Sequence, residues 1–593
     1  MSALTNVLRQ PEARQAGGAI LRQIGLGNTL STIGRLVWRM GLRRDDMPRQ
    51  FLLNFWETLG EREAIIDGDR RISFGQFRER VLGLTSGLHR LGVGEDAACA
   101  ELLYNGSTWF ELMMANSMLG APMPMLNWHL QKEEVVACVN RAAPRVLVFD
   151  SEFLDTIRSV RDQFETVEHL VVVGAPAESG ITPYESLIEK SATQLPPGSF
   201  NLAPKPYSGG TTGTPKYINM DHSAMMGESD TARRGATREQ VVQLLLKQAS
   251  MLYWYGLGEL HDPQTHNVRS LIPGPLYHAG VQVGVMPFFF GGTVVPMRRF
   301  SPEGVLALIE RERINWTFVA PTMLERILAL PEELKARYDL GTMHTIICAA
   351  APCPPRVKRE INALFRRQGA SRDVFHEYYG ASETGLITIL VPEDYRDHEG
   401  RYESVGKIRA AHCRIYDPDT RQWAPTGQRG KVLVRSAMTF GLEYVGQKDK
   451  TDECFIEIDG ENWYDDGLIG YVDEDEFLYL TSRVKEMIIS GGVNLFPNEI
   501  EHVIKQHPLV LDVAVVRAPD PDLGEVPAAV VELRDGAEVT EEELLQFCKD
   551  NGLYGFKLPR IIDFVDHLPR NLAGKLPKKE LEARYWQAVA QHA

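Results

Sequence analysis

The segment PYSGGTTGTPK, residues 206–216, combines three residue types that can hold a phosphate group. Its glycines leave backbone N–H groups open to a ligand, its Ser and Thr side chains offer hydroxyls, and Lys216 supplies a positive charge. A flexible loop of this kind with a cation can cradle phosphates. It is not a Walker A sequence, because Pro215 precedes Lys216 and Tyr217 follows it. Taken alone, the segment fits either a phosphate-binding loop or an ordinary surface loop.

Helical and strand patterns alternate from about residue 60 and would position this loop. Ser73 followed by Gln76 forms a capping box, which predicts a helix over 74–91. Short β-branched runs bounded by turn residues predict further strands. These strands are expected at 145–150, 169–174, 317–320 and 345–348. Strands separated by helices are typical of an α/β fold with helices on both faces of a parallel or mixed sheet.

Two later regions depart from this alternation of helices and strands. Short strands and glycine turns over 410–445 predict a small β-rich subdomain. After residue 483 a separate α+β unit of about 110 residues is expected. Its predicted elements are a helix at 497–505, paired strands over 511–520 and 527–533, and a helix that starts after the Thr540–Glu543 capping box and is closed by Gly552.

Composition excludes several classes of function. The 593 residues carry a net charge of −15, which disfavours binding to duplex nucleic acid. The seven cysteines form no CxxC pair, so neither a zinc site nor a disulfide framework is indicated, and a reducing, cytoplasmic compartment fits best. The most apolar long window, 279–296, is interrupted by Gln282 and Pro287 and is predicted to be buried core rather than a membrane span.

The first 45 residues hold seven arginines and two acids, Glu12 and Asp45. Apolar residues at helical spacing predict a basic N-terminal helical extension over 1–45. Three interpretations stay open for it. It could pack on the main domain, lie on an anionic membrane surface as a peripheral contact, or act as a targeting segment.

Four further motifs accompany the loop in a fixed order: PLYHAGV at 275–281, YYGASETG at 378–385, WYDDGLIGYVDEDEFLYLTSRVKEMIISGG at 463–492 and PRNLAGK at 569–575. Together they resemble the adenylate-forming superfamily of acyl-CoA synthetases, luciferases and peptide-synthetase adenylation domains, closest to fatty-acyl-CoA ligases, over residues 50–590. The resemblance implies an N-terminal adenylation domain, 46–483, of helix-flanked mixed sheets plus the β-rich subdomain. It also implies a mobile α+β C-terminal domain, 484–593, that carries a catalytic lysine.

The implied reaction is the ATP-dependent ligation of a carboxylic acid to coenzyme A, with ATP, Mg²⁺ and CoA as cofactors and substrates. Hydroxide is a poor leaving group, so AMP is first transferred to the carboxylate and pyrophosphate leaves. The CoA thiol then attacks the acyl carbon and releases AMP. The first step depends mainly on positioning and charge neutralisation.

The resemblance implies that the loop holds the β- and γ-phosphates of ATP through Ser208, Thr211, Thr212, Gly213 and Lys216. The implied catalytic residues are Thr211, Lys216, Glu383 and Lys575. Thr211 and Glu383 would bind Mg²⁺. A hard cation of this kind prefers oxygen ligands. The chain departs from the family pattern at Gly209, where Ser is usual, and at Tyr217, where Gly is usual.

The adenosine part of ATP is assigned by the same resemblance. Tyr379 would stack on adenine, Ser382 would bond the α-phosphate, and the segment of Ala350, Ala351 and Pro352 would flank adenine. Family members often have Gly at 349 and 350, so the alanines here predict a narrower pocket floor. Asp466 would accept hydrogen bonds from both ribose hydroxyls, and Arg483 would reach the same ribose.

The acyl pocket is expected at Tyr277, His278 and Gly380. His278 fits either a pocket role or an ordinary core histidine. No acid stands at 277–279, whereas amino-acid-activating relatives carry an Asp there, and an unpaired ammonium in an apolar site is costly. The substrate is therefore expected to be an apolar acid, a medium- or long-chain fatty acid. An aryl or steroid-side-chain acid, or an acyl-AMP ligase that delivers to a carrier protein, remain the alternatives.

The C-terminal domain is expected to swing about Lys485. Lys575 would reach the carboxylate and α-phosphate in the adenylating pose, whereas Gly491 and Gly492 would line the pantetheine tunnel in the thioester-forming pose. Expected partners are the acid, ATP and free CoA, with no nucleic acid, and a homodimer remains open.

Overall fold

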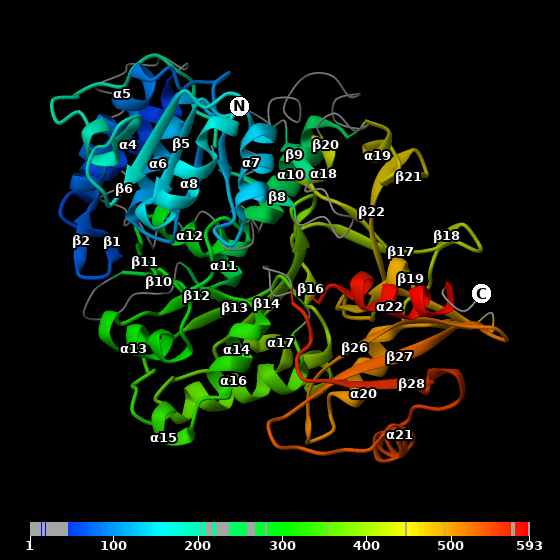
Figure 1. Ribbon diagram of the computed structural model, residues 1–593. Helices are drawn as coiled ribbons and strands as arrows, with labels where there is room; N and C mark the ends of the chain where they lie inside the picture. The colour runs from blue at the N-terminus through cyan, green and yellow to red at the C-terminus, as the bar shows by residue number, and fades with distance from the viewer. Residues whose placement is uncertain are drawn as a thin grey trace.

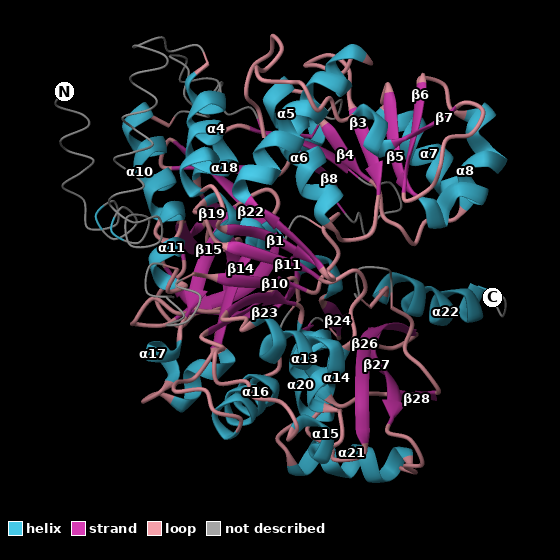
Figure 2. Ribbon diagram, turned by 90° about the vertical axis from the view of Figure 1, so that its left-hand side faces the viewer, coloured by secondary structure: helices cyan, strands magenta, loops and turns pink. Residues whose placement is uncertain are grey.

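The computed structural model describes residues 14, 18, 46–202, 204–208, 216–220, 236–257, 267–278, 282–351, 353–444, 448–491, 493–570 and 576–590. The strands of these residues form four sheets (Figures 1 and 2). The predicted extension over 1–45 lies outside the described residues apart from two positions.

The first sheet has the order β16-β15-β14-β13-β12-β10-β11-β1-β2 and is parallel in its centre, with antiparallel strands at both edges. Its strands are β1 (Glu63–Asp67), β2 (Arg70–Ser73), β10 (Arg269–Ile272), β11 (Thr293–Pro296), β12 (Trp316–Val319), β13 (Thr345–Cys348), β14 (Phe375–Ala381), β15 (Gly385–Leu390) and β16 (Lys407–Ile408). Central strands covered on both faces are mostly apolar, and β10 to β13 are buried along their whole length.

The second sheet has the order β20-β9-β8-β4-β3-β5-β6-β7 and is parallel from β8 to β7. Its strands are β3 (Cys99–Leu102), β4 (Met123–Met125), β5 (Val146–Asp150), β6 (His169–Val173), β7 (Ile181–Pro183), β8 (Pro204–Ser208), β9 (Lys216–Met220) and β20 (Leu442–Tyr444). The two strands at the other end of the sheet, β20 and β9, run antiparallel to their neighbours.

Helices cover both long sheets (Figure 2). They are α4 (Met47–Leu59), α5 (Phe74–Arg90), α6 (Ser107–Leu119), α7 (Lys132–Ala142), α8 (Leu154–Val160), α10 (Arg238–Ala249), α11 (Met251–Trp254), α12 (Gln282–Phe289), α13 (Pro302–Glu312), α14 (Pro321–Leu328), α15 (Glu332–Lys335), α16 (Pro355–Arg367) and α17 (Pro392–Tyr395). One apolar core joins the two sheets. At its centre the ring of Phe77 on α5 lies 5.2 Å from Trp56 on α4 and 5.0 Å from Phe288 on α12.

A third, antiparallel sheet forms the β-rich part, in the order β18-β17-β19-β22-β21 with β23 beside β22. Its elements and the short helices near it are β17 (His412–Asp417), β18 (Gln422–Trp423), β19 (Gly430–Arg435), α18 (Ala437–Phe440), α19 (Lys448–Asp452), β21 (Phe455–Ile458), β22 (Glu461–Val472) and β23 (Leu478–Arg483).

The C-terminal elements gather around a fourth sheet, drawn orange to red at the lower right of Figure 1. They are η6 (Val484–Glu486), β24 (Ile488–Ser490), β25 (Val493–Leu495), α20 (Pro497–Ile504), β26 (Val510–Asp520), β27 (Gly524–Leu533), α21 (Glu541–Asp550), η7 (Gly555–Lys557), β28 (Ile561–Val565) and α22 (Lys578–Ala590). This part has its own apolar core, as a separate folding unit requires.

The predicted α/β class is confirmed, and most predicted elements are present. The helix at 74–91 is α5, with both capping-box hydrogen bonds between Ser73 and Gln76. The strands at 145–150, 169–174, 317–320 and 345–348 are β5, β6, β12 and β13. No helix among the described residues is long and apolar enough to cross a bilayer.

Candidate active site

The motif YYGASETG forms the end of β14, a tight turn and the start of β15. Gly380 must be glycine, because a Cβ there would stand 2.1 Å from the carbonyl oxygen of Gly385. The turn is closed by Thr384, whose Oγ1 accepts a hydrogen bond of 3.0 Å from the backbone N–H of Ala381. Ser382 and Glu383 therefore lie at the tip of a rigid turn, as a site that must hold phosphates and a cation requires.

Glu383 is joined to two tyrosines from other sheets. The hydroxyl of Tyr444 donates to Oε1 of Glu383 at 3.1 Å, and the hydroxyls of Tyr444 and Tyr464 lie 3.4 Å apart. Tyr444 is on β20, which pairs with β9, and β9 begins at Lys216 directly after the glycine-rich loop. This contact connects the predicted metal carboxylate to the strand that follows the predicted phosphate loop. Sequence reasoning missed Tyr444, which lies outside every motif that it used.

Tyr379 and Asp466 also meet in the structure. The hydroxyl of Tyr379 donates a hydrogen bond to Oδ2 of Asp466, although 87 residues separate them. Burial raises the pKa of Asp466 to about 7, and the positive charge of Arg483 acts in the opposite direction. Arg483 is near because β22 and β23 pair with Leu468 opposite Arg483. Three of the predicted nucleotide residues thus share one corner of the molecule.

The segment predicted to flank adenine follows β13. Strand β13 runs parallel to β14 with Cys348 opposite Glu377, so residues 349–351 leave the sheet beside Tyr378 and Tyr379. Ala350 has φ +76°, in the left-handed region, where a residue other than glycine costs about 1–2 kcal/mol. Pro352 lies outside the described residues.

The glycine-rich loop connects an antiparallel pair of strands. Ser208 on β8 is opposite Lys216 on β9, so the residues on either side of the loop are neighbours in the sheet. Thr211, Thr212 and Gly213 lie outside the described residues, and only the backbones of Ser208 and Lys216 are described. The two strands therefore fix the positions of Ser208 and Lys216, between which the loop runs.

Tyr277 and His278 lie side by side, with ring centroids 4.4 Å apart, and the ring of Trp128 packs edge-on against Tyr277 at 5.2 Å. Tyr277 is 6% exposed, and its hydroxyl has no hydrogen-bond partner among the described residues. Asn105 fixes the preceding loop, because its Nδ2 donates to the carbonyl of Gly274 at 2.7 Å and its Oδ1 accepts from the N–H of Leu276 at 2.9 Å. Sequence reasoning missed Trp128 and Asn105.

The residues predicted to serve the moving domain are described in part. Lys485 is exposed within η6, and Gly491 lies in the β24–β25 hairpin with φ +55°. A Cβ at Gly491 would contact side chains of Leu523 and Phe556 at 3.2 and 3.3 Å. Gly492 and Lys575 lie outside the described residues.

The arrangement fits a magnesium ion held mostly by a nucleotide. The described part of the chain contains no group of three or more His, Cys, Asp or Glu side chains that could bind a metal. Magnesium in nucleotide sites typically uses one or two carboxylates together with phosphates and water. Glu383 is half-buried, its recorded hydrogen bond uses Oε1, and Oε2 has no hydrogen-bond partner among the described residues.

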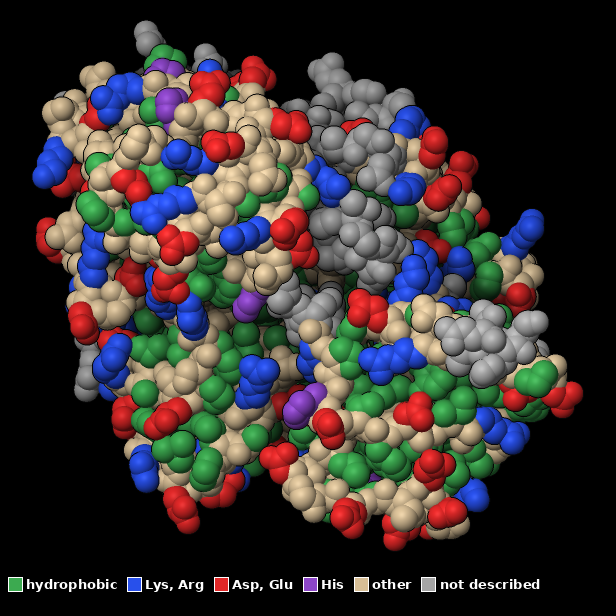
Figure 3. Space-filling view, in the orientation of Figure 1, with side chains coloured by type: hydrophobic (Ala, Val, Ile, Leu, Met, Phe, Trp, Pro, Cys, Tyr) green, Lys and Arg blue, Asp and Glu red, His purple; other side chains and the backbone are tan. Residues whose placement is uncertain are grey.

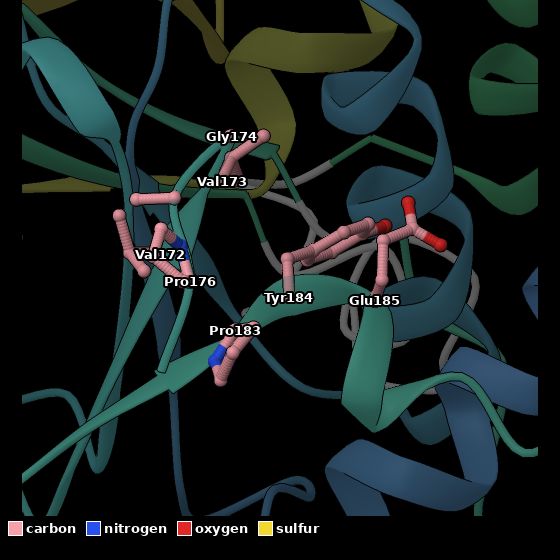
Figure 4. Close-up of a pocket in the computed structure, with 8 residues that line it drawn as sticks. Val172, Val173, Gly174, Pro176, Pro183, Tyr184 and Glu185 are labelled. Carbon is pink, nitrogen blue, oxygen red and sulfur yellow. The ribbon is translucent and has the colours of Figure 1, made fainter. Parts of the chain in front are cut away.

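A shallow apolar cavity of about 240 Å³ lies elsewhere, between the end of β6 and the short helix Tyr184–Leu187 (Figure 4). None of the predicted site residues lines it. Its polar groups are already paired, since Tyr184 donates to Glu111 at 2.7 Å and Glu185 accepts from Arg80 at 2.8 Å. It does not belong to the candidate site.

Comparison with known families identifies the class of protein that this fold and site define. The model of the AMP-binding enzyme family matches residues 54–442, and that of the AMP-binding enzyme C-terminal domain matches 499–575. The chain belongs to the AMP-binding enzyme family.

Its relatives share nearly the whole chain. It is 27% identical to the mitochondrial medium-chain acyl-CoA ligase ACSF2 of Homo sapiens, over 96% of this chain and 93% of that protein. It is 25% identical to 4-coumarate–CoA ligase 1 of Petroselinum crispum, over 94% and 98%. The solved amide bond synthetase McbA from Marinactinospora thermotolerans is 26% identical, with a TM-score of 0.71 over 89% of this chain and 98% of that one. The predicted superfamily and the predicted AMP-forming acid–thiol ligase are confirmed.

Proposed function

We propose that this ligase activates an apolar carboxylic acid as acyl-AMP and then transfers the acyl group to CoA. The observation that carries the proposal is that one turn motif contacts two distant parts of the chain. Tyr379 bonds Asp466, and Glu383 accepts from Tyr444 on β20, which pairs with the strand that leaves the glycine-rich loop. Basic and acidic side chains are interspersed on the face shown in Figure 3, as expected for a protein that binds small anions at one site rather than a polyanion over its surface.

Each residue has a role in the first half-reaction. Tyr379 and the 350–352 segment would hold adenine, while Asp466 and Arg483 would hold the ribose. Ser382 would bond the α-phosphate, where the attack takes place. The loop residues Ser208, Thr211, Thr212, Gly213 and Lys216 would hold the phosphates that leave as pyrophosphate. Fixed donors and cations of this kind stabilise the charge that develops on the leaving group.

Mg²⁺, held by Glu383 and Thr211, would neutralise charge on the leaving phosphates when it is bound. Glu383→Gln removes one negative charge at nearly constant volume. We expect the rate of adenylation to fall by about 30- to 1,000-fold, which corresponds to roughly 2–4 kcal/mol. Pyrophosphate release at saturating Mg²⁺ and ATP measures this, and an unchanged rate would contradict the assignment.

The proposed acid is a medium- or long-chain fatty acid. It is supported by the absence of an acidic side chain at Tyr277 and His278 and by the burial of Tyr277, because a charged substituent would enter this site unpaired. The human relative is named for medium-chain acids. The edge-on pair of Trp128 and Tyr277 favours a flat aryl acid as the second candidate, since aromatic rings pack well in such an arrangement.

The second half-reaction would use the C-terminal domain, proposed at 484–593 next to an adenylation domain at 46–483. Lys575 would approach the acyl carboxylate in one pose. In the other, Gly491 and Gly492 would line the CoA tunnel after rotation about Lys485. The β24–β25 hairpin presents Ile489 (48% exposed) and Val493 (42% exposed) to solvent here, which leaves this apolar edge available to a second pose.

A panel of acids tests the proposal. Pyrophosphate release is measured with saturated fatty acids of increasing length, aryl acids and amino acids, each with and without CoA. We expect release with apolar acids, AMP and acyl-CoA formation only when CoA is present, and no turnover of amino acids. Acyl-AMP formation without thioester at saturating CoA would instead indicate delivery to a carrier protein.

A further inference from the structure

One chain of hydrogen bonds crosses three sheets at the site. Tyr464 on β22 belongs to the third sheet, Tyr444 on β20 to the second, and Glu383 follows β14 of the first. Tyr444 donates to Glu383 at 3.1 Å, and because a hydroxyl has one proton, the 3.4 Å contact with Tyr464 must use the proton of Tyr464. The direction of donation is therefore Tyr464 to Tyr444 to the carboxylate.

Both tyrosine rings are held firmly. Tyr444 is 3% exposed and Tyr464 is 6% exposed, and the ring of Phe455 packs edge-on against Tyr464 at 5.6 Å. The backbone N–H of Tyr444 also donates to Oγ1 of Thr451 at 3.0 Å. A tyrosine hydroxyl is ordinarily protonated near neutral pH, so both groups can donate.

The position of Tyr444 links the Glu383 carboxylate to the strand that follows the glycine-rich loop. Strand β20 pairs antiparallel with β9, with Tyr444 opposite Ile218, two residues after Lys216. The hydroxyl that bonds Glu383 therefore comes from the strand paired with the one that follows the loop. A glutamate side chain alone has several rotamers, and a buried hydrogen-bond donor restricts it to one.

We propose that Tyr444, supported by Tyr464, is a positioning residue that fixes the orientation of the Glu383 carboxylate and so sets the metal-dependent part of ATP binding. This inference rests on the proposed role of Glu383. Partners that orient a metal-binding carboxylate typically contribute about 10- to 100-fold to metal affinity or activity.

The test compares ATP binding with and without the cation. The variants are Tyr444→Phe and Tyr464→Phe, which remove only hydroxyls. Tyr184→Phe is the matched control, because Tyr184 is 2% exposed and also donates to a buried carboxylate, Glu111, at 2.7 Å. Calorimetry gives the dissociation constant of ATP in excess Mg²⁺ and in EDTA, and the ratio of the two is the metal-dependent increment. Paramagnetic resonance of Mn²⁺ in the presence of ATP gives a second readout that does not depend on turnover.

We expect Tyr444→Phe to lower the increment about tenfold while the constant in EDTA stays within twofold of the wild type. Tyr464→Phe should have a smaller effect of the same sign, and Tyr184→Phe should have none. Mn²⁺ affinity should follow the same order. An unchanged increment in a folded Tyr444→Phe protein, or an equal loss in Tyr184→Phe, would overturn the inference.

The outcomes separate this inference from the function on which it rests. If Glu383→Gln abolishes the increment and Tyr444→Phe does not, the positioning role fails and the proposed function stands. If the wild type shows neither a metal-dependent increment nor pyrophosphate release with any acid, the proposed function fails, and this inference fails with it.

Discussion

Asp466 gives the site a pH dependence whose direction follows from its surroundings. Its pKa is raised from 3.8 to about 7 because the carboxyl is buried. In the proposed role, the ionised form would accept hydrogen bonds from both ribose hydroxyls. A carboxyl of pKa about 7 is roughly 10% ionised at pH 6 and roughly 90% ionised at pH 8. The affinity for the ribose should therefore rise by up to about tenfold from pH 6 to pH 8.

The assay is equilibrium binding of adenosine, which has no group that titrates near neutral pH, whereas the phosphates of ATP do. Asp466→Asn should remove the pH dependence and weaken binding about 10- to 150-fold at pH 8, the usual range for one hydrogen bond to a charged group. Asp465→Asn is the matched control, because Asp465 is paired with Lys431 at 2.9 Å rather than with Tyr379. Adenosine affinity that is flat from pH 6 to pH 8 in the wild type, or that falls equally in both variants, would refute the ribose assignment.

Three further predictions concern the C-terminal elements and the N-terminal segment 1–45. Lys575→Ala should slow adenylation about 100- to 1,000-fold and leave thioester formation from supplied acyl-AMP nearly intact, whereas Gly492→Leu should do the reverse. Each half-reaction is assayed alone, and an equal loss of both half-reactions in both variants would contradict the two-pose interpretation. Arg429→Ala removes an ion pair with Glu499, so the ratio of the adenylation rate to the thioester-forming rate should shift by up to about fivefold. An unchanged ratio would show that the contact does not select a pose. Deletion of residues 1–45 should abolish salt-sensitive binding to anionic vesicles and should preserve activity on a short-chain acid. If the full-length protein binds no vesicles at low salt, the extension has no lipid role.

The elements that sequence predicted are those fixed by local patterns. The helix α5 follows from a capping box and an apolar stripe within 18 residues, and β13 and β26 follow from β-branched runs. The nearness of Tyr379 to Asp466 was predicted only through the resemblance to a family. Neither composition nor periodicity could bring together two residues 87 positions apart.

The parts of the site that sequence missed are held by long-range contacts. Asn105 supports the Tyr277 loop through a hydrogen bond to Gly274 that spans 169 residues, and Tyr444 reaches Glu383 across 61 residues. Such contacts depend on the order of strands in a sheet, and a sequence pattern for one strand does not specify its neighbour. The left-handed backbone at Ala350 was also unpredictable, because alanine rarely adopts it.

The C-terminal elements are tied weakly to the third sheet and strongly to one another, as the proposed pivot at Lys485 requires. Arg429, which directly precedes β19 of the third sheet, pairs with Glu499 on α20 and lies 5.4 Å from the Phe496 ring, but its side chain is 45% exposed. An ion pair and a cation–π contact this exposed are together worth about 1–2 kcal/mol, so they hold one pose only weakly.

Lys578 makes a stronger link on the other side. It is largely buried and lies 2.7 Å from Glu501 on α20 and 3.2 Å from Glu486 in η6. Breaking a buried pair of this kind leaves an uncompensated charge, which is strongly destabilising. Glu486 should therefore move with α20 and α22, whereas Arg483 is fixed in β23 of the third sheet. A rotation of the C-terminal elements must then be absorbed between Arg483 and Glu486, and only residues 484 and 485 lie in that interval.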